Sequence, residues 1–404
     1  MSPARPLPKA GHGGADVTLL KQVFGPVDAG TEPQSDLMRP VYCVLGMPID
    51  AVNMAAVVDR IDAAAANRAP LLISTPNLNF LVGSLSDPEF RESLLDSDLC
   101  PPDGAPIVWI ARLLGLPVKE RVAGSDLLDE LRGRRTGMGR LTIFLFGGAK
   151  GVAEAAARTI NARPGGLNCV GTMDPGFCEV DEMSRDHVIE TVNSSAADFL
   201  VLALGAKKGQ LWLQRNHNRL TIPIRAHLGA AINFQAGSVK RAPPILRAWG
   251  LEWLWRIKEE HYLWRRYRDD ALILLRLLFT RVLPLAVLTR WHGFLSTSQT
   301  INLLIEKTLD GQSTLIRLGG VASEKQIPQA ISCFQEALEF NKDVIVDLSD
   351  ARVIDARFLG LLLMLRKKLK ARGAKLIFIG ISRRMGRIFR LSEAEFLLSY
   401  CEAD

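Results

Sequence analysis

The sequence predicts an α/β protein with two folded units, the first built on a parallel sheet flanked by helices. Three short apolar runs, at residues 69–74, 141–146 and 198–204, alternate with longer helical patterns, as strands buried on both faces do. The chain has 404 residues, more than the roughly 100 to 200 at which single domains usually close. Its composition, 48% hydrophobic and 23% charged, supplies material for two cores and excludes a chain disordered throughout.

The N-terminal residues 1–38 are rich in Pro, Gly and small polar side chains without apolar periodicity, so we expect a disordered tail there. The first domain is expected over residues 39–250. Its three strands end in small or polar residues, at 75–77, 147–149 and 205–208. Because ligands in open α/β sheets bind beyond the carboxyl ends of the strands, these loops are expected to line one cleft.

Residues 251–296 change character, because tryptophans there are interleaved with arginines and lysines. Such side chains favour the headgroup layer and anionic lipid, which predicts a basic amphipathic helical appendage, an interfacial helix pair. Arg276, Arg281 and Pro284 interrupt its apolar part, and we find no uncharged apolar stretch of about 18 residues to span a bilayer. With no signal peptide apparent, a cytoplasmic protein, peripheral on the inner face of the cell membrane, is expected.

Residues 297–404 predict a compact second α/β domain. Asp310-Gly311 between two strand-like runs, 301–308 and 313–318, is a strong hairpin signal. The runs that follow predict a helix at 325–338, a strand at 344–348, a helix at 358–371, a strand at 375–379 and a last helix.

Charge and cysteine content narrow the function classes. A net charge of +7 and a pI near 9.2 favour partners that carry phosphate or carboxylate, such as nucleic acid, anionic lipid or sugar nucleotides. The six cysteines form no C-x-x-C pair, so neither zinc nor disulfides are suggested, and a reducing cytosol fits best. The basic stretch from Lys119 to Arg140 lacks aromatic platforms, which favours a solvated face over a nucleic-acid site.

Asp103 is the leading candidate for chemistry. It stands in a Pro-Asp-Gly turn at the mouth of the predicted sheet, where a carboxylate can be held rigidly and used as a general base. Taken alone, the turn favours the simpler interpretation, a plain turn aspartate before glycine. Asp96 and Asp98 have the D-x-D spacing of a metal site, but they follow a helical stretch, which favours a solvated helix end. No metal and no cofactor are predicted.

Several ordered stretches together resemble the WecG/TagA/CpsF family of bacterial glycosyltransferases, with the likeness running from about Val41 to Arg268. This many matches in order is far more specific than one motif. The resemblance implies a Rossmann-like parallel-sheet glycosyltransferase domain with a basic amphipathic helical appendage. The matching stretches are Ser74–Asn77, Asp87–Arg91, Pro102–Gly115, Arg121–Leu128, and Lys240–Pro243 with Gly250–Leu254.

The resemblance implies an inverting, metal-independent transfer from a UDP-sugar to a polyprenyl-diphosphate-linked acceptor in surface polysaccharide biosynthesis. Asp103 would deprotonate the acceptor hydroxyl, while Thr75 and Asn77 would position the sugars. Arg121 would bind phosphate, because without a metal the arginines and helix N-termini must balance the departing diphosphate. Further candidates for substrate binding are Gly147, Gly148, Lys208, Gln210, Asn233, Arg256, Arg265, Arg266 and Arg268.

Two segments depart from the family pattern. Lys207-Lys208-Gly209-Gln210 stands where Pro-Lys-Gln-Glu is usual, and Ile232-Asn233-Phe234 replaces Phe-Asp-Phe. The altered segments point to a different donor contact and a different base or sugar preference. A non-catalytic, nucleotide-sugar-sensing regulator and an enzyme with a soluble acceptor remain alternatives.

Residues 299–396 resemble a STAS domain, the small α/β fold of anti-sigma-factor antagonists. In that family an Asp-Ser-Ser/Thr-Gly sequence carries a hydroxyl that is phosphorylated, whereas Asp355-Ala356-Arg357-Phe358 has none, so no phospho-switch is expected. Arg357 puts a cation at a helix N-terminus, where the macrodipole prefers anions, which hints at an acidic partner or an internal carboxylate. Docking or dimerisation through an unknown protein partner is the favoured role.

Overall fold

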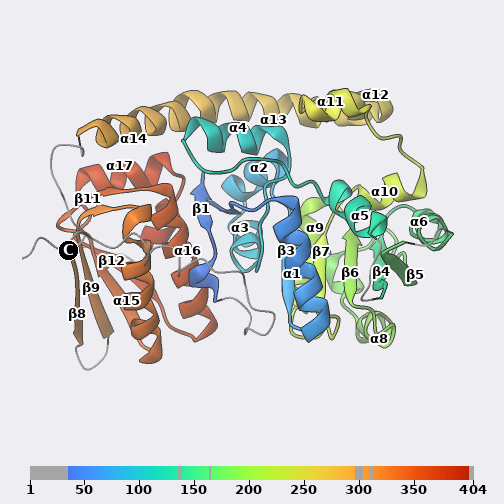
Figure 1. Cartoon of the computed structure of the whole chain (residues 1–404), viewed down its shortest axis with the longest axis horizontal. Helices are drawn as coiled ribbons and strands as arrows, with labels where there is room; N and C mark the ends of the chain where they lie inside the picture. Colours follow the sequence, from blue (N-terminus) through green and yellow to red (C-terminus); the bar gives the residue numbers. More distant parts are fainter. Residues whose placement is uncertain (1–34, 135–138, 163–164, 296–303, 310–312, 400–404) are drawn as a thin grey trace, which may run out of the picture. The chain divides into compact units, whose positions relative to one another are not determined.

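The predicted parallel sheet is present, with five strands in the order β3-β7-β6-β4-β5 and every neighbouring pair parallel (Figure 1). The structure is a computed structural model that describes residues 35–134, 139–162, 165–295, 304–309 and 313–399. All three predicted strands are confirmed, and two more complete the sheet. The strands are Leu71–Ser74 (β3), Leu141–Gly147 (β4), Leu167–Met173 (β5), Phe199–Ala203 (β6) and Ile224–His227 (β7).

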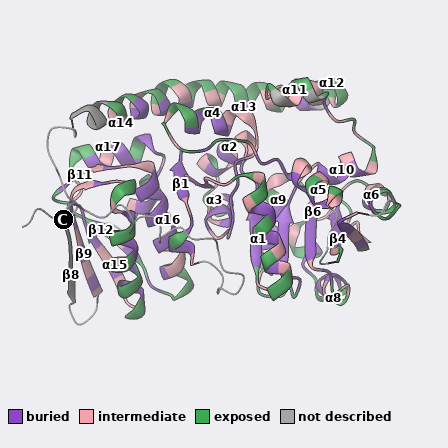
Figure 2. Ribbon diagram, in the orientation of Figure 1, coloured by how far each residue is buried: buried purple, intermediate pink, exposed green. Residues whose placement is uncertain are grey.

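Alternate side chains of these strands enter two different cores, one on each face of the sheet. Figure 2 shows that the central strands of the sheet are largely buried. Ile143 and Leu145 of β4 join one core, while Phe144 and Phe146 join the other. The first core is covered by α1 (Met54–Asn67), α5 (Gly124–Gly133), α6 (Val152–Asn161) and α10 (Ala231–Ala236). The second is covered by α7 (Val180–Met183), α8 (Asp186–Ser194) and α9 (Ala206–Asn216).

A two-stranded antiparallel hairpin, Val41–Val44 (β1) and Met47–Asp50 (β2), precedes the sheet. The tail predicted over residues 1–38 lies mostly outside the described residues. Its end corrects the prediction, because Asp36–Met38 form a short 3-10 helix (η2) in which Leu37 is buried. A third core contains side chains of the hairpin, of α2 (Leu78–Ser86), α3 (Pro88–Leu95) and α4 (Ala105–Leu113), and of the appendage.

The appendage is one long helix preceded by shorter ones rather than the predicted pair. Pro284 does not end it, because a π-helical turn (η4, Leu278–Val282) widens the backbone just where the ring would otherwise crowd the preceding turn. In the described part of the chain, one helix, Trp264–Arg290, is long and apolar enough to cross a membrane by length and composition, which corrects the expectation that none is. The helices are α11 (Pro244–Ala248), α12 (Glu252–Glu259), α13 (Trp264–Leu277) and α14 (Leu283–Leu295).

The C-terminal domain has a second sheet in the order β11-β9-β10-β12, with β8 antiparallel to β9. The antiparallel pair agrees with the predicted hairpin, although the Asp310-Gly311 turn itself lies outside the described residues. Strand β11 was not predicted. The elements are β8 (Leu304–Leu309), β9 (Ser313–Ala322), α15 (Ile327–Glu339), β10 (Asp343–Asp347), β11 (Ala351–Ile354), α16 (Ala356–Ala371), β12 (Leu376–Ile379) and α17 (Arg383–Leu391).

The core of this C-terminal domain includes residues from the beginning of the chain. Leu37, Val41 and Cys43 belong to the same buried cluster as the apolar face of α16, together with Leu95 from α3. Residues from Ser35 onward accordingly form one compact unit by their contacts. The hairpin β1–β2 is thus shared between the two sequence-predicted domains.

Candidate functional site

The site forms where the carboxyl ends of the parallel strands meet one edge of the sheet. Asp103 lies beside the end of β3, because its N–H donates to the carbonyl of Pro76 at 2.9 Å. Gly104 then takes a φ of 87°, a left-handed value that glycine adopts without strain, and α4 begins at the next residue. Asp103 is therefore fixed between β3 and the N-terminus of α4.

Asn77 links Asp103 to the helix that follows β3. Its side-chain Oδ1 caps α2 by accepting from the N–H of Phe80 at 3.2 Å, which leaves its amide group free to donate to the Asp103 carboxylate. Thr75, the other predicted sugar-positioning residue, is buried directly after β3. The structure thus brings Thr75, Asn77 and Asp103 together.

The surroundings of Asp103 raise the pKa of its carboxyl group to near neutral pH. Burial raises the pKa of Asp103 from its ordinary value of 3.8 to about 7, although the Arg121 guanidinium and the hydrogen bond from Asn77 pull it back down. Glu252 and Asp126 add smaller upward contributions, since like charges disfavour ionisation. A carboxyl group with a pKa near 7 is suited to act as a base at neutral pH.

Arg121 is not free in this structure. Its guanidinium donates to Glu252 at 2.8 Å and to Asp126 at 3.0 Å. Asp126 also pairs with Arg241, which bonds Asp129 as well, and lies 3.6 Å from Arg247. The predicted phosphate ligand is thus part of a mixed cluster of three arginines and three carboxylates, and whether it binds phosphate stays a prediction.

The cluster also explains how the appendage reaches the site. Gly250 lies so close to Ala105 that a Cβ on it would be 2.5 Å from the Ala105 Cβ. This approach puts the N-terminus of α12, with Glu252, over the start of α4. Glu252, Asp126 and Arg241 were not predicted, although each lies in a stretch that carries the family resemblance.

Other predicted substrate ligands lie apart from Asp103. Gly147 ends β4 and Gly148 follows it. Two strands, β6 and β7, separate β4 from β3, so these glycines lie about 14 Å from the end of β3 at the usual spacing of strands. The Gly148 N–H already donates to the carbonyl of Ala203 at 2.8 Å. Asn233 lies in α10, which packs on α6 beyond this glycine loop.

Two residues of the altered segment after β6, Lys208 and Gln210, lie near the start of α9. Lys208 donates to the Cys178 carbonyl at 3.1 Å and pairs with Glu179 at 3.0 Å. Gln210 is completely buried and accepts from the Ser74 hydroxyl at 3.0 Å. Gln210 is thus enclosed beside the end of β3, while Lys208 makes a surface ion pair, and whether either residue contacts a sugar nucleotide stays a prediction.

The predicted arginines of the appendage divide into two sets. Arg256 pairs with Glu260 at 2.6 Å and lies 6.0 Å from the Phe234 ring, so it connects α12 with α10. The others, at the start of α13, are exposed and lie over aromatic rings, where cation–π contacts hold their stems. They are Arg265, Arg266 and Arg268.

The D-x-D pair is neither a metal site nor the solvated helix end that the sequence favoured. Asp98 accepts from the N–H of Leu72 at 2.9 Å and from Lys367 at 2.7 Å, and Asp96 pairs with Lys370 at 3.1 Å. Lysines of α16 therefore neutralise both carboxylates. Within the described ranges, no group of three or more His, Cys, Asp or Glu side chains is placed to hold a metal ion.

The N-terminus of α16 contacts the chain's own hairpin. Arg357 is buried, donates to the carbonyl of Val41 at 3.0 Å and lies 5.8 Å from the Tyr42 ring. Tyr42 in turn donates to Glu324 at 3.0 Å. The position that carries a hydroxyl in the resembled family is thus filled by a cation with internal partners.

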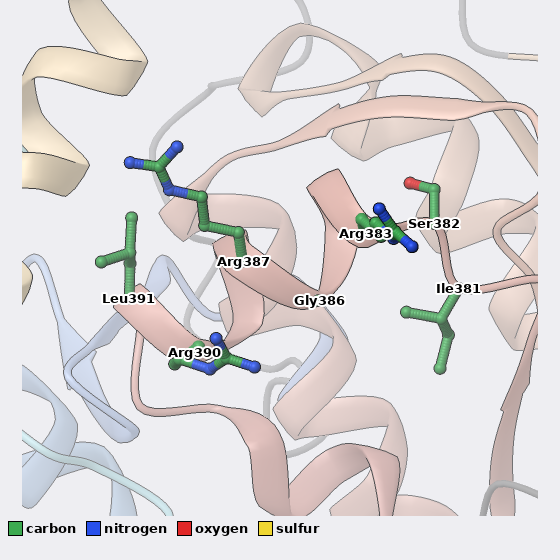
Figure 3. A pocket seen from close by; sticks show the side chains of 7 residues that line it. All are labelled: Ile381, Ser382, Arg383, Gly386, Arg387, Arg390 and Leu391. Carbon is green, nitrogen blue, oxygen red and sulfur yellow. The ribbon is translucent and has the colours of Figure 1, made fainter.

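A hollow of about 640 Å³ lies elsewhere, on α17 of the C-terminal domain (Figure 3). Arg383, Arg387 and Arg390 extend around it, and Arg390 pairs with Glu395 at 3.1 Å. None of the residues around Asp103 lines it.

Comparison with known proteins defines the class of this molecule. Residues 42–286 match the glycosyl transferase WecG/TagA/CpsF family, and residues 297–402 match the STAS domain. The chain belongs to the WecG/TagA/CpsF family and is a glycosyltransferase with a C-terminal STAS domain. Both resemblances inferred from the sequence are thereby confirmed.

Similar proteins include two enzymes named N-acetylglucosaminyldiphosphoundecaprenol N-acetyl-beta-D-mannosaminyltransferase. That of Bacillus spizizenii is 24% identical over 48% of this chain and 73% of its own length. That of Staphylococcus aureus is 23% identical over 53% of this chain and 82% of its own length. A crystal structure of an antisigma-factor antagonist STAS domain from Rhodobacter sphaeroides, 24% identical, covers 21% of this chain and 97% of that one, with a TM-score of 0.17.

Proposed function

We propose that this glycosyltransferase moves a sugar from a UDP-sugar, with inversion and without a metal ion, onto a polyprenyl-diphosphate-linked acceptor in surface polysaccharide biosynthesis. The observation that carries the proposal is Asp103, whose carboxyl group has a pKa of about 7 and lies beside Arg121 at the carboxyl edge of the sheet. The relatives named for an N-acetylglucosaminyldiphosphoundecaprenol acceptor support a polyprenyl-linked acceptor here.

In the proposed step, Asp103 takes the proton of the acceptor hydroxyl while that oxygen bonds to the anomeric carbon. The bond from this carbon to the UDP oxygen breaks, and its electron pair leaves on the diphosphate. No second carboxylate is needed to protonate this leaving group, since a diphosphate departs as an anion. Arg121, which faces Asp103, and Arg241 and Arg247 of the same cluster would balance its charge, exchanging contacts with their carboxylate partners for contacts with the diphosphate.

The long helix supports a place on the membrane surface. Leu277 and Val282 pack into the protein core, so lipid could not surround the helix as it surrounds a spanning one. Its outer face exposes Leu272, Phe279 and Val287, each more than half accessible, and Figure 2 shows exposed residues all along it. Exposed apolar side chains beside the arginines of α13 favour an anionic membrane surface on the cytoplasmic side.

Transfer assays with the purified chain test the proposal. We expect sugar transfer from a UDP-sugar panel that includes UDP-N-acetylmannosamine to N-acetylglucosaminyl-diphosphoundecaprenol, and equal rates with EDTA. Asp103→Asn should abolish transfer, whereas Asp59→Asn, at an exposed position of α1, should leave it unchanged. Full activity of Asp103→Asn would reject the base assignment, and loss of activity with EDTA would reject metal independence.

The orientation of Lys208 and Gln210 favours one alternative, a regulator that binds a nucleotide sugar without transferring it. Gln210 is completely buried, and Lys208 is bound by the Cys178 carbonyl and by Glu179. Calorimetry with UDP-sugars separates the two functions. Binding of a UDP-sugar without transfer to any acceptor of the polyprenyl-diphosphate class would support the regulator.

A further inference from the structure

Basic side chains on one turn of helix α16, in the STAS domain, contact the segment that precedes Asp103. Lys367 donates to Asp98 at 2.7 Å and to the carbonyl of Ser97 at 3.1 Å. On either side of it, Arg366 pairs with Glu92 at 2.8 Å and Lys370 pairs with Asp96 at 3.1 Å. One helix thus binds Glu92 of α3 and three consecutive residues after it, Asp96, Ser97 and Asp98.

The buried side chain of Arg39 links the same segment to α16 and to Asp50. It is 1% exposed, and its Nη1 approaches both the Ser97 carbonyl at 2.9 Å and the Met364 sulfur of α16 at 3.4 Å. Its other nitrogens bind Asp50, at 2.7 Å for the shorter contact. Asp50 in turn accepts from the N–H of Cys100 at 2.7 Å. A buried charge held by so many partners resists displacement, because moving it would leave a neighbour unpaired.

Only two residues separate Cys100 from Asp103, and both are prolines. Pro101 and Pro102 have φ fixed by their rings, so the segment is stiff and a shift at Cys100 reaches Asp103. The Pro102 carbonyl is also held by the N–H of Val122 at 2.8 Å. The position of Asp103 therefore depends on where α16 holds residues 96–98 and where Asp50, bound by Arg39, holds Cys100.

The N-terminal half of α16 packs closely against β1 of the hairpin. A Cβ on Gly360 would lie 2.1 Å from the carbonyl oxygen of Val41, so only glycine permits this approach. Arg357 binds the same carbonyl one helical turn earlier. The surface of the STAS domain around the start of α16 is thus occupied by the chain itself.

We propose that the STAS domain is a positioning element of the transferase, in which Lys367 of α16, acting with Arg39, holds the segment 96–102 so that Asp103 stays at the sheet edge. The partner of this STAS surface is the chain's own β1 and the segment after α3. The inference rests on the proposed function, since it gives Asp103 its purpose. Lys367 touches no reacting atom and acts through Asp103.

Hydrogen exchange in the full-length chain tests the contact without any substrate. In Lys367→Met the amides of residues 96–100 and of Asp103 should exchange faster than in the unaltered chain. Lys325→Met makes the same change at an exposed position of the same domain and should leave these amides as they are. Unaltered exchange in Lys367→Met would overturn the proposal, whatever the enzyme's substrates prove to be.

Kinetics separate positioning from mere loss of fold. Lys367→Met should lower kcat by about tenfold or more while KM for the donor holds, because a misplaced base costs rate rather than binding. The charged groups that face Asp103, namely Arg121, Glu252 and Asp126, are untouched. Greater access of water should therefore move the acid limb of the pH–rate profile from about 7 toward lower pH.

Lys367→Arg keeps the charge and should restore both kcat and the acid limb. A fall in kcat with an unshifted limb, or no rescue by arginine, would indicate a structural role only. In the Asp103→Asn background, Lys367→Met should have no further effect on residual transfer. Should Asp103→Asn itself retain full activity, the base assignment fails while the exchange experiment still decides whether α16 holds the segment.

Discussion

The pKa of the Asp103 carboxyl group is set by opposing effects of burial and of neighbouring polar groups. Burial removes water from the carboxylate, whereas Arg121 and Asn77 favour its charge. Because burial prevails, the proton stays on until about pH 7. A more exposed aspartate would ionise readily but accept a proton from a hydroxyl poorly.

The raised pKa of Asp103 predicts a stability effect. Above pH 7 the group is charged in both states and only the folded state bears the desolvation, so Asp103→Asn should melt roughly 2 to 4 °C higher at pH 8. Between pH 7 and pH 4 the folded state binds the proton more tightly, which stabilises the unaltered chain as pH falls. Thermal melts should therefore show the difference shrinking toward pH 5, and a difference independent of pH would contradict the shift.

The sequence predicted residue contacts well where strand topology determines them. Asn77 follows β3 and Asp103 was expected at the same edge of the sheet, and the two side chains are hydrogen-bonded in the structure. The partners of Arg121 could not be derived from spacing, because Glu252 reaches it from 131 residues away. Gln210 was assigned from a motif in which it is displaced by one residue, and a shift by one residue on a helix turns a side chain by about 100°.

The elements show the same division. Runs of Val, Leu and Phe predicted β4 and β6, but β7 was missed because Arg225 and His227 break its apolar pattern. Arg225 can be buried there since the carbonyls of Leu220 and Ile222 accept its hydrogen bonds. The edge strand β5 was missed because its residues are mostly polar or half-exposed.

The long helix predicts a defined membrane contact. Phe279 is 65% exposed on its outer face, and removing that ring from lipid should weaken vesicle binding of Phe279→Asp about tenfold or more. Phe177→Asp, at a fully exposed site before α7, makes the same change away from the helix and should bind normally. Sedimentation with vesicles that contain anionic lipid measures both, and equal binding would exclude this face.

At Gly360 of α16 we expect an alanine substitution to be destabilising, although alanine has the higher helix propensity. Gly360→Ala should gain about 1 kcal/mol from propensity, yet the clash with Val41 should make it destabilising by about 1 to 3 kcal/mol overall. Gly386→Ala, in α17 with only Ile381 near its Cβ at 4.0 Å, should be stabilising. Urea denaturation compares the pair. A stabilised Gly360→Ala would show that α16 and β1 are not so closely packed.

One hydrophobic core contains residues from both ends of the described chain, which the domain boundaries predicted from the sequence did not anticipate. Because Leu37, Val41 and Cys43 complete the cluster around α16, the glycosyltransferase and STAS parts should not melt separately. Calorimetry of the full-length chain should give one transition, and a chain ending at residue 296 should lose solubility as well as thermal stability. Two resolved transitions would contradict a shared core.

The shared core also orders events during synthesis. Val41 is synthesised about 350 residues before Phe389 and Leu397, which belong to the same buried cluster. At roughly 5 to 20 residues per second the hairpin waits on the order of 20 to 70 s for them. Throughout that interval its apolar side chains depend on a chaperone or on temporary contacts, so this polypeptide cannot mature strictly from its first domain to its second.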